Sequence, residues 1–191
     1  MFSNQKGKYR YLKTQPVRIG LLTVGFLLIC AAVFMIGFLT KGSSKNIFTV
    51  IAVLGMLPVA KLIVSFIMCI KAEKYSCPEE IHNLINDTSK DLNICLGYDF
   101  YLTSYKTNFP IYSCFVYDGS MILLSGDSKT DSKECKEHIE KYLTTNSIEG
   151  IRVYILDNKN TFIDRLKGVS KDYQKTEKDM TAYALIKSLS L

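Results

Sequence analysis

Two apolar stretches near the amino terminus decide the fold. Residues 19–39 read IGLLTVGFLLICAAVFMIGFL, and residues 47–70 read IFTVIAVLGMLPVAKLIVSFIMCI. The first stretch holds 21 residues without a charged side chain, and the second holds 24 residues with one, Lys61. A hydrocarbon core of about 30 Å needs about 20 helical residues at about 1.5 Å each, so both stretches are long enough to cross it. Since lipid offers no partner for backbone amides, both stretches are predicted to be transmembrane helices.

Only residues 40–46 join the two stretches, which predicts an antiparallel hairpin over residues 19–70. A cleaved signal peptide is the alternative for the first stretch. Its apolar region, however, is longer than the roughly 7–15 residues of that class, and no small-x-small cleavage site follows it. A buried helix of a soluble protein is the alternative for the second stretch, and a length of 24 residues argues against it. Small residues that would let the two helices approach closely are Gly20, Gly25, Gly37, Ala52 and Gly55.

The net positive charge of the chain is confined to its first third. Residues 1–70 carry eight basic side chains and no acidic one, whereas residues 71–191 carry 16 basic and 18 acidic ones. The two parts therefore contribute +8 and −2 to the net charge of +6. This asymmetry argues against a basic nucleic-acid-binding domain, and no nucleic-acid partner is expected.

Basic residues also flank the two apolar stretches unequally. Five of them precede the first stretch, in the flank formed by residues 1–18: Lys6, Lys8, Arg10, Lys13 and Arg18. Lys71 and Lys74 follow the second stretch, while the connecting turn holds Lys41 and Lys45. The positive-inside rule then predicts a two-pass protein with both termini in the cytoplasm. The flank is either this orientation signal alone or a segment that also lies on anionic lipid headgroups, where each cation adds about 1 kcal/mol.

Lys61 is the anomalous residue of the hairpin. A lysine near the centre of a transmembrane helix costs roughly 2.5–3.5 kcal/mol, and such charges are usually functional. One interpretation is that Lys61 faces a polar cavity or an acidic partner, which must come from another chain because neither stretch contains an acid. The alternative is that the flexible stem of Lys61 snorkels to the cytoplasmic boundary. Pro58, three residues earlier, is expected to free a carbonyl and kink the helix.

Residues 71–191 are predicted to form a small cytoplasmic α/β domain with the order α-β-β-β-α-β-α-α, which makes the whole chain an α+β membrane protein. Its cysteines have no paired spacing, as expected of reduced thiols. A helix is expected over residues 76–90, with Ser76 or Cys77 as its cap, and Asp118-Gly119 predicts a tight hairpin. The remaining elements are strands over residues 98–105, 111–117 and 120–125, a turn over 108–110, a helix capped near Asp131, a strand over 151–156, and helices over 161–167 and 176–190.

Few residues of this domain suggest chemistry. Cys135 and His138 stand three apart on one predicted helix, and Asp127 lies in the polar loop before it, so these three residues form a candidate polar site. A zinc site would need further ligands, and the alternative is that Cys135 is a small core residue with His138 beside it. No phosphate-binding loop, dinucleotide fingerprint or HExxH motif is present. No catalytic residue, metal or cofactor is therefore predicted.

Three functions remain open. The first is a non-enzymatic integral membrane subunit whose cytoplasmic domain binds or regulates a partner, within a homo- or hetero-oligomer. Its expected partners are the lipid bilayer and another membrane protein or a second copy of this chain. The second is an oligomeric channel or pore-forming effector, with Lys61 lining the pore and the domain acting as its gate. The third is a membrane-tethered enzyme with an unrecognised site. The lack of a catalytic motif, together with the charge in the second stretch, favours the first function over the other two.

Overall fold

A computed structural model describes residues 6–42, 46–105, 107–128 and 130–191, so Lys45 of the predicted turn lies outside the described residues. Over the described ranges the chain forms six helices and one four-stranded mixed sheet. It divides into two compact units. One is Lys13–Lys74, and the other combines the segment up to Leu12 with Tyr75–Leu191. We call them the helical unit and the sheet unit.

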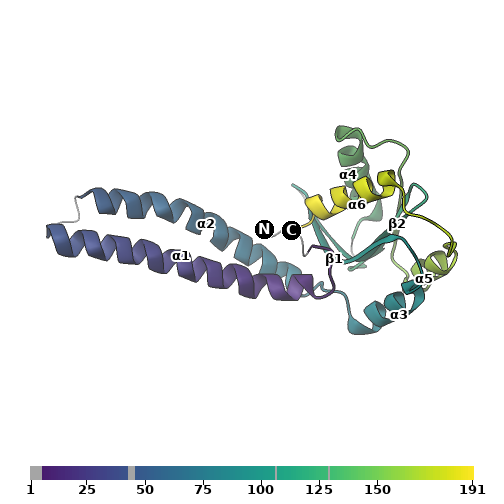
Figure 1. The fold of residues 1–191 in the computed structure, drawn as a ribbon, viewed down its shortest axis with the longest axis horizontal. Helices are drawn as coiled ribbons and strands as arrows, with labels where there is room; N and C mark the ends of the chain where they lie inside the picture. The colour runs from purple at the N-terminus through teal and green to yellow at the C-terminus, as the bar shows by residue number, and fades with distance from the viewer. Residues whose placement is uncertain (1–5, 43–45, 106, 129) are drawn as a thin grey trace. The chain divides into compact units, whose positions relative to one another are not determined.

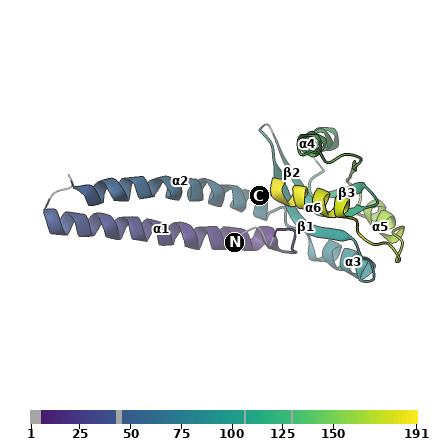
Figure 2. The ribbon, with the colours of Figure 1, turned by 45° about the horizontal axis from the view of Figure 1, so that its top comes forward.

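Two long helices, α1 (Tyr11–Lys41) and α2 (Ile47–Glu73), form the helical unit and run side by side in opposite directions, as Figures 1 and 2 show. Asn46 joins them: its side chain accepts from the Thr49 amide at 2.9 Å to cap α2, and donates to the Gly37 carbonyl at 3.0 Å. The two helices are apolar on their outer surfaces, since their most hydropathic windows are only 6% and 11% buried.

Glycines allow α1 and α2 to pack closely. A Cβ atom on Gly55 would lie 2.9 Å from Sγ of Cys30, and one on Gly37 would lie 2.4 Å from Cβ of Phe48. The atom facing Gly55 is the end of a rotatable side chain, whereas Cβ of Phe48 cannot move away from Gly37, so Gly37 is the position that requires glycine. Gly25 does not have this role, because a Cβ atom on Gly25 would meet no other atom within 4 Å. Small residues therefore assist the contact at some of the predicted positions and not at Gly25.

The sheet has the order β1-β2-β3-β4, with β1 (Cys95–Thr103), β2 (Asn108–Tyr117) and β3 (Ser120–Ser125) antiparallel and β4 (Arg152–Leu156) parallel to β3. The predicted order of helices and strands is confirmed. The Asp118-Gly119 turn has φ of 46° and 63°, the positive values that a two-residue hairpin of this kind needs. Helix α4 (Ser132–Thr145) then carries the chain from β3 to the parallel strand β4.

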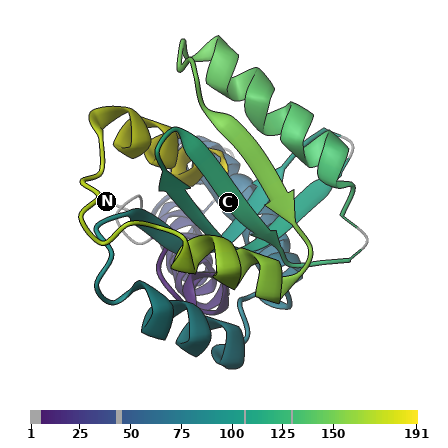
Figure 3. The same ribbon diagram turned by 90° about the vertical axis from the view of Figure 1, so that its right-hand side faces the viewer.

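Helices cover both faces of this sheet, as the view along it in Figure 3 shows. On one face, α4 (Ser132–Thr145) and α6 (Glu177–Leu189) bury the core that contains Ile139 and Ile186. On the other face, α3 (Glu79–Ser89) and α5 (Lys159–Lys167) bury a second core around Phe115 and Phe162. Strands buried on both faces read as apolar runs rather than as strict alternation.

Three details of the sequence prediction were wrong. Strand β1 begins at Cys95 rather than at Tyr98, and the predicted turn over residues 108–110 is the first part of β2. Pro110 lies opposite Tyr101 in the ladder between β1 and β2. Helix α3 begins at Glu79 without a side-chain cap. The N-cap position is Pro78, so Ser76 and Cys77 lie before it. The Ser76 hydroxyl and the Cys77 amide donate to the carboxylate of Asp99.

Candidate functional site

The segment of residues 6–12, here called the amino-terminal strap, belongs to the sheet unit. Strand β1 lies at the edge of the sheet, and the amide of Tyr98 donates to the carbonyl of Gly7 at 2.9 Å. The hydroxyl of Tyr11 donates to the carbonyl of Leu191 at 3.2 Å, and the ammonium of Lys6 donates to the carbonyl of Ser190. The strap and the carboxyl terminus therefore cover an edge that would otherwise expose unpaired backbone groups.

An aromatic cluster holds the strap on α3 and β1. The ring of Tyr9 stacks on His82 with centroids 3.7 Å apart and planes 4° apart, and His82 meets the edge of Tyr98 at 4.6 Å. Within the described chain, Nδ1 of His82 and the hydroxyl of Tyr98 are buried without a hydrogen-bond partner. Burial lowers the pKa of His82, as does Arg10, while Asp99 and Glu79 act in the opposite direction. The cluster therefore favours the neutral imidazole.

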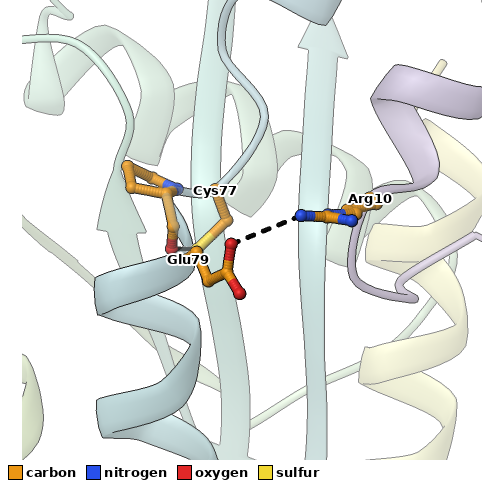
Figure 4. A network of polar contacts seen from close by, with 4 residues as sticks. Arg10, Cys77 and Glu79 are labelled. Atoms are coloured by element: carbon orange, nitrogen blue, oxygen red, sulfur yellow. Dashed lines mark hydrogen bonds and ion pairs between the residues drawn. The ribbon is translucent and has the colours of Figure 1, made fainter.

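An exposed ion pair stands beside this cluster. Nη2 of Arg10 lies 3.3 Å from Oε2 of Glu79, the first residue of α3, and Figure 4 shows the two side chains pointing toward one another. The guanidinium also lies 5.4 Å from the ring centroid of Tyr9. Because both partners are largely solvated, such a pair is worth about 0–1 kcal/mol. Arg10 therefore adds orientation to the strap more than stability.

Asp99 forms the polar centre beneath the strap. It is fully buried in β1 with φ of 57°, a left-handed conformation that is uncommon outside glycine and more tolerated by Asp than by most residues. Its carboxylate accepts from the Cys77 amide at 2.6 Å and from the Ser76 hydroxyl at 3.1 Å. Burial, followed by the charge of Asp99, raises the pKa of the Cys77 thiol to about 12. A thiol so protected is not a nucleophile at neutral pH.

Asp127, one of the predicted polar-site residues, lines a hollow of about 270 Å³ between the loops at one end of the sheet. Tyr75 donates to its carboxylate at 3.3 Å, and Glu134 also lines the hollow. A third acid, Asp131, is already engaged, because it caps α4 by accepting from the amides of Lys133 and Glu134. The hollow is slightly smaller than typical ligand pockets of about 300–1,000 Å³.

Cys135 and His138 occupy packing positions on α4. Cys135 is fully buried in the core against the sheet, and this burial, with a further contribution from Glu134, raises the pKa of its thiol to about 12. The ring of His138 lies 5.6 Å from that of Phe109 and 5.0 Å from that of Tyr142, and burial lowers its pKa. Over the described residues, no group of three or more His, Cys, Asp or Glu side chains could hold a metal ion.

The other predicted site residues fall in different places. Lys6, Lys8 and Arg10 lie in the strap, while Lys13 and Arg18 are exposed on α1. Lys61 and Pro58 are exposed on α2. Sequence reasoning missed His82, Tyr98 and Asp99 as a cluster; the tyrosines interleaved with cations in the flank are the signal that could have indicated packing. No known protein family, curated protein or solved structure matches this chain.

Proposed function

We propose that this chain is a two-pass integral membrane protein, with both termini in the cytoplasm, whose sheet unit binds or regulates a partner within a homo- or hetero-oligomer. The observation that carries the proposal is the pair α1 and α2, which are 31 and 27 residues long and expose large apolar side chains along their length. Exposure of so much apolar surface is unfavourable in water and is not unfavourable in lipid.

The sheet unit is built from two separate segments of the chain, and this supports an even number of membrane crossings. Residues 6–12 come before the helical unit Lys13–Lys74 in the chain and Tyr75–Leu191 come after it, yet both are parts of one compact unit joined by hydrogen bonds. Two segments that fold together must lie on the same side of a membrane, so helices that separate them must return to the side they left. The presence of the strap in the sheet unit also argues against a cleaved signal peptide, because cleavage after α1 would remove the strap that covers β1.

A non-enzymatic role is supported by how the reactive side chains are used. The thiols of Cys77 and Cys135 are buried with raised pKa values, and the two histidines pack against aromatic rings. These groups stabilise the unit rather than line a common cavity. Cytoplasmic placement is supported by the charge asymmetry of the flanks and by six free buried cysteines over the described residues.

Thiol labelling in cells that express the full chain tests this proposal. The native cysteines are buried, so a membrane-impermeant maleimide reports mainly on an introduced thiol. Tyr105→Cys marks the sheet unit, because Tyr105 is fully exposed, and Thr40→Cys marks the end of α1. We expect intact cells to label only Thr40→Cys, and opened cells to label both variants.

Two results would contradict the proposal. One is labelling of Tyr105→Cys in intact cells, which would place the sheet unit outside. The other is recovery of the wild-type chain in the supernatant after high-speed centrifugation without detergent, which would remove the membrane from the interpretation. The unaltered chain is the control for background labelling.

A further inference from the structure

Lys61 lies on the face of α2 that is turned away from α1. Val59 is fully buried within the helical unit, and Lys61 is two residues further, or about 200° around the helix. Across the described residues Lys61 forms no ion pair. Neighbouring α1 therefore offers this cation no compensation.

The length of α2 places Lys61 near the middle of a bilayer. If residues 47–70 are centred on a core of about 30 Å, Lys61 lies about 11 Å from the boundary near Lys71 and about 19 Å from the other. A lysine stem of five bonds spans roughly 6 Å. Helical side chains also lean toward the amino terminus of their helix, which here is the more distant boundary. Snorkelling therefore falls short without a large local distortion of the bilayer.

A backbone carbonyl without its usual donor adds a polar group to the face of α2 that carries Lys61. Pro58 has no amide hydrogen, so the carbonyl of Leu54 lacks its usual donor within the helix. Leu54 is seven residues before Lys61 and lies about 20° from it around the helix, on the same face. Ser65 does not extend this polar strip, because its hydroxyl donates back to the carbonyl of Lys61 at 3.0 Å. A cation and an acceptor thus stand on one side of an otherwise apolar helix.

We propose that the Lys61 face of α2, defined by Leu54, Pro58 and Lys61, docks a transmembrane helix of a different protein that carries a carboxylate near its centre. Charge complementarity selects this occupant, since an intramembrane cation needs an anion to offset its desolvation. A second copy of this chain cannot supply that anion, because neither predicted span contains Asp or Glu. The inference rests on the proposed function, in that α2 must span the membrane.

Fluorescence energy transfer in phosphatidylcholine vesicles at pH 7.5 tests the inference with the full chain and a defined probe. The probe is a 21-residue leucine-rich transmembrane peptide with a central glutamate, and the reference peptide has leucine there. We expect the glutamate peptide to associate with the wild-type chain about 5- to 30-fold more strongly than the reference. Lys61→Leu should abolish this preference, Lys61→Arg should keep it, and Lys71→Leu, a matched loss of charge at the end of α2, should not change it.

Each alternative outcome would overturn the docking proposal. Equal association of the two peptides with the wild-type chain would show that no carboxylate is selected, and an unchanged preference in Lys61→Leu would place the interaction elsewhere. Ion conductance by the wild-type chain alone, with selectivity reversed in Lys61→Glu, would assign Lys61 to a pore. The thiol-labelling pattern is measured separately, in cells that express Tyr105→Cys or Thr40→Cys. If it shows that α2 does not span, the proposed function fails; if α2 spans without a peptide preference, only this inference fails.

Discussion

Replacing Tyr9 by alanine should release the amino-terminal strap from the sheet unit while leaving the rest of that unit folded. The ring of Tyr9 stacks on His82 at 3.7 Å and meets the edge of Tyr98 at 6.3 Å. An aromatic pair contributes about 0.5–1.5 kcal/mol beyond area burial, and a half-buried ring contributes a similar amount through burial itself. The loss of about 1–3 kcal/mol lowers the docking equilibrium about 5- to 150-fold.

The other contacts of the strap, among them the bonds of Tyr11 and Lys6 to the carboxyl terminus, stay the same in the variant and so do not replace the lost ring. The Arg10–Glu79 ion pair is exposed, with side chains 54% and 68% accessible, and contributes at most about 1 kcal/mol. Arg10 also lies over the ring of Tyr9, so the variant removes that contact as well. The backbone bond from Tyr98 to Gly7 forms only while the strap is docked.

Hydrogen exchange of the Tyr98 amide in the full chain, in detergent micelles, measures docking directly, because that amide donates to Gly7. Protection of Tyr98 should fall by the same 5- to 150-fold factor in Tyr9→Ala, whereas amides in the centre of β2 should keep their protection. Tyr105→Ala is the matched control, since Tyr105 is a fully exposed tyrosine of the same unit. Equal protection of Tyr98 in the wild type and in Tyr9→Ala would refute the assignment of Tyr9 as the anchor.

Three further predictions concern the same unit. Because burial lowers the pKa of His82, the contribution of neutral His82 to strap docking is fully present above about pH 6.5 and declines as the pH falls toward the lowered pKa. Hydrogen exchange of the Tyr98 amide, corrected for intrinsic rates, should therefore accelerate in that pH range in the wild type and not in His82→Phe. Asp179→Ala should lower the free energy of unfolding by about 3 kcal/mol in urea titrations followed by circular dichroism, because it removes the buried carboxylate that accepts from the amides of Gly119 and Thr176, with exposed Glu177→Ala as the control. Cys77 should resist maleimide at pH 7.5 until urea unfolds the chain.

Protonation of Asp179 at low pH is expected to lower the stability of the sheet unit. Its burial alone would raise its pKa, but hydrogen bonds from the Tyr173 hydroxyl, from the amide and hydroxyl of Thr176, and from the Gly119 amide lower it below the usual value. The stabilisation that these donors provide is therefore present above about pH 4 and is lost as the pH falls through the lowered pKa. Together with Thr176 the residue also forms a reciprocal cap on α6.

Local signals in the sequence were sufficient for most of the fold. Asp118-Gly119 has a steric requirement that only a tight hairpin meets, and the cap at Asp131 is formed by its side chain as predicted. The apolar lengths of α1 and α2 likewise follow from composition alone. Such features depend on neighbours along the chain, which is the information that one sequence provides.

The candidate site depends on residues far apart in the chain, and this is why sequence reasoning missed it. Tyr9 and His82 are 73 positions apart, and each taken alone has an ordinary surface character. The sequence predicts Ser76 or Cys77 as a helix cap, because nothing local indicates that the segment before Pro78 is held instead by the distant carboxylate of Asp99. The aromatic alternation begins at Tyr98, so the sequence predicts a strand from that residue, whereas pairing of Cys95 with Val116 extends β1.

Because the sheet unit is made of two segments far apart in the chain, docking of the strap carries a cost in chain entropy. Docking of the strap on β1 closes a loop that contains the 62 residues Lys13–Lys74, and for a flexible chain of that length the closure costs about 3–4 kcal/mol in entropy. That is at least as much as the aromatic anchor provides. The antiparallel packing of α1 and α2, fixed by Asn46 and by the contact between Gly37 and Phe48, returns the chain to its starting end and removes most of this cost. We therefore expect helix pairing and strap docking to stabilise each other, so that the edge of β1 is covered less completely in a chain whose two apolar helices are unpaired.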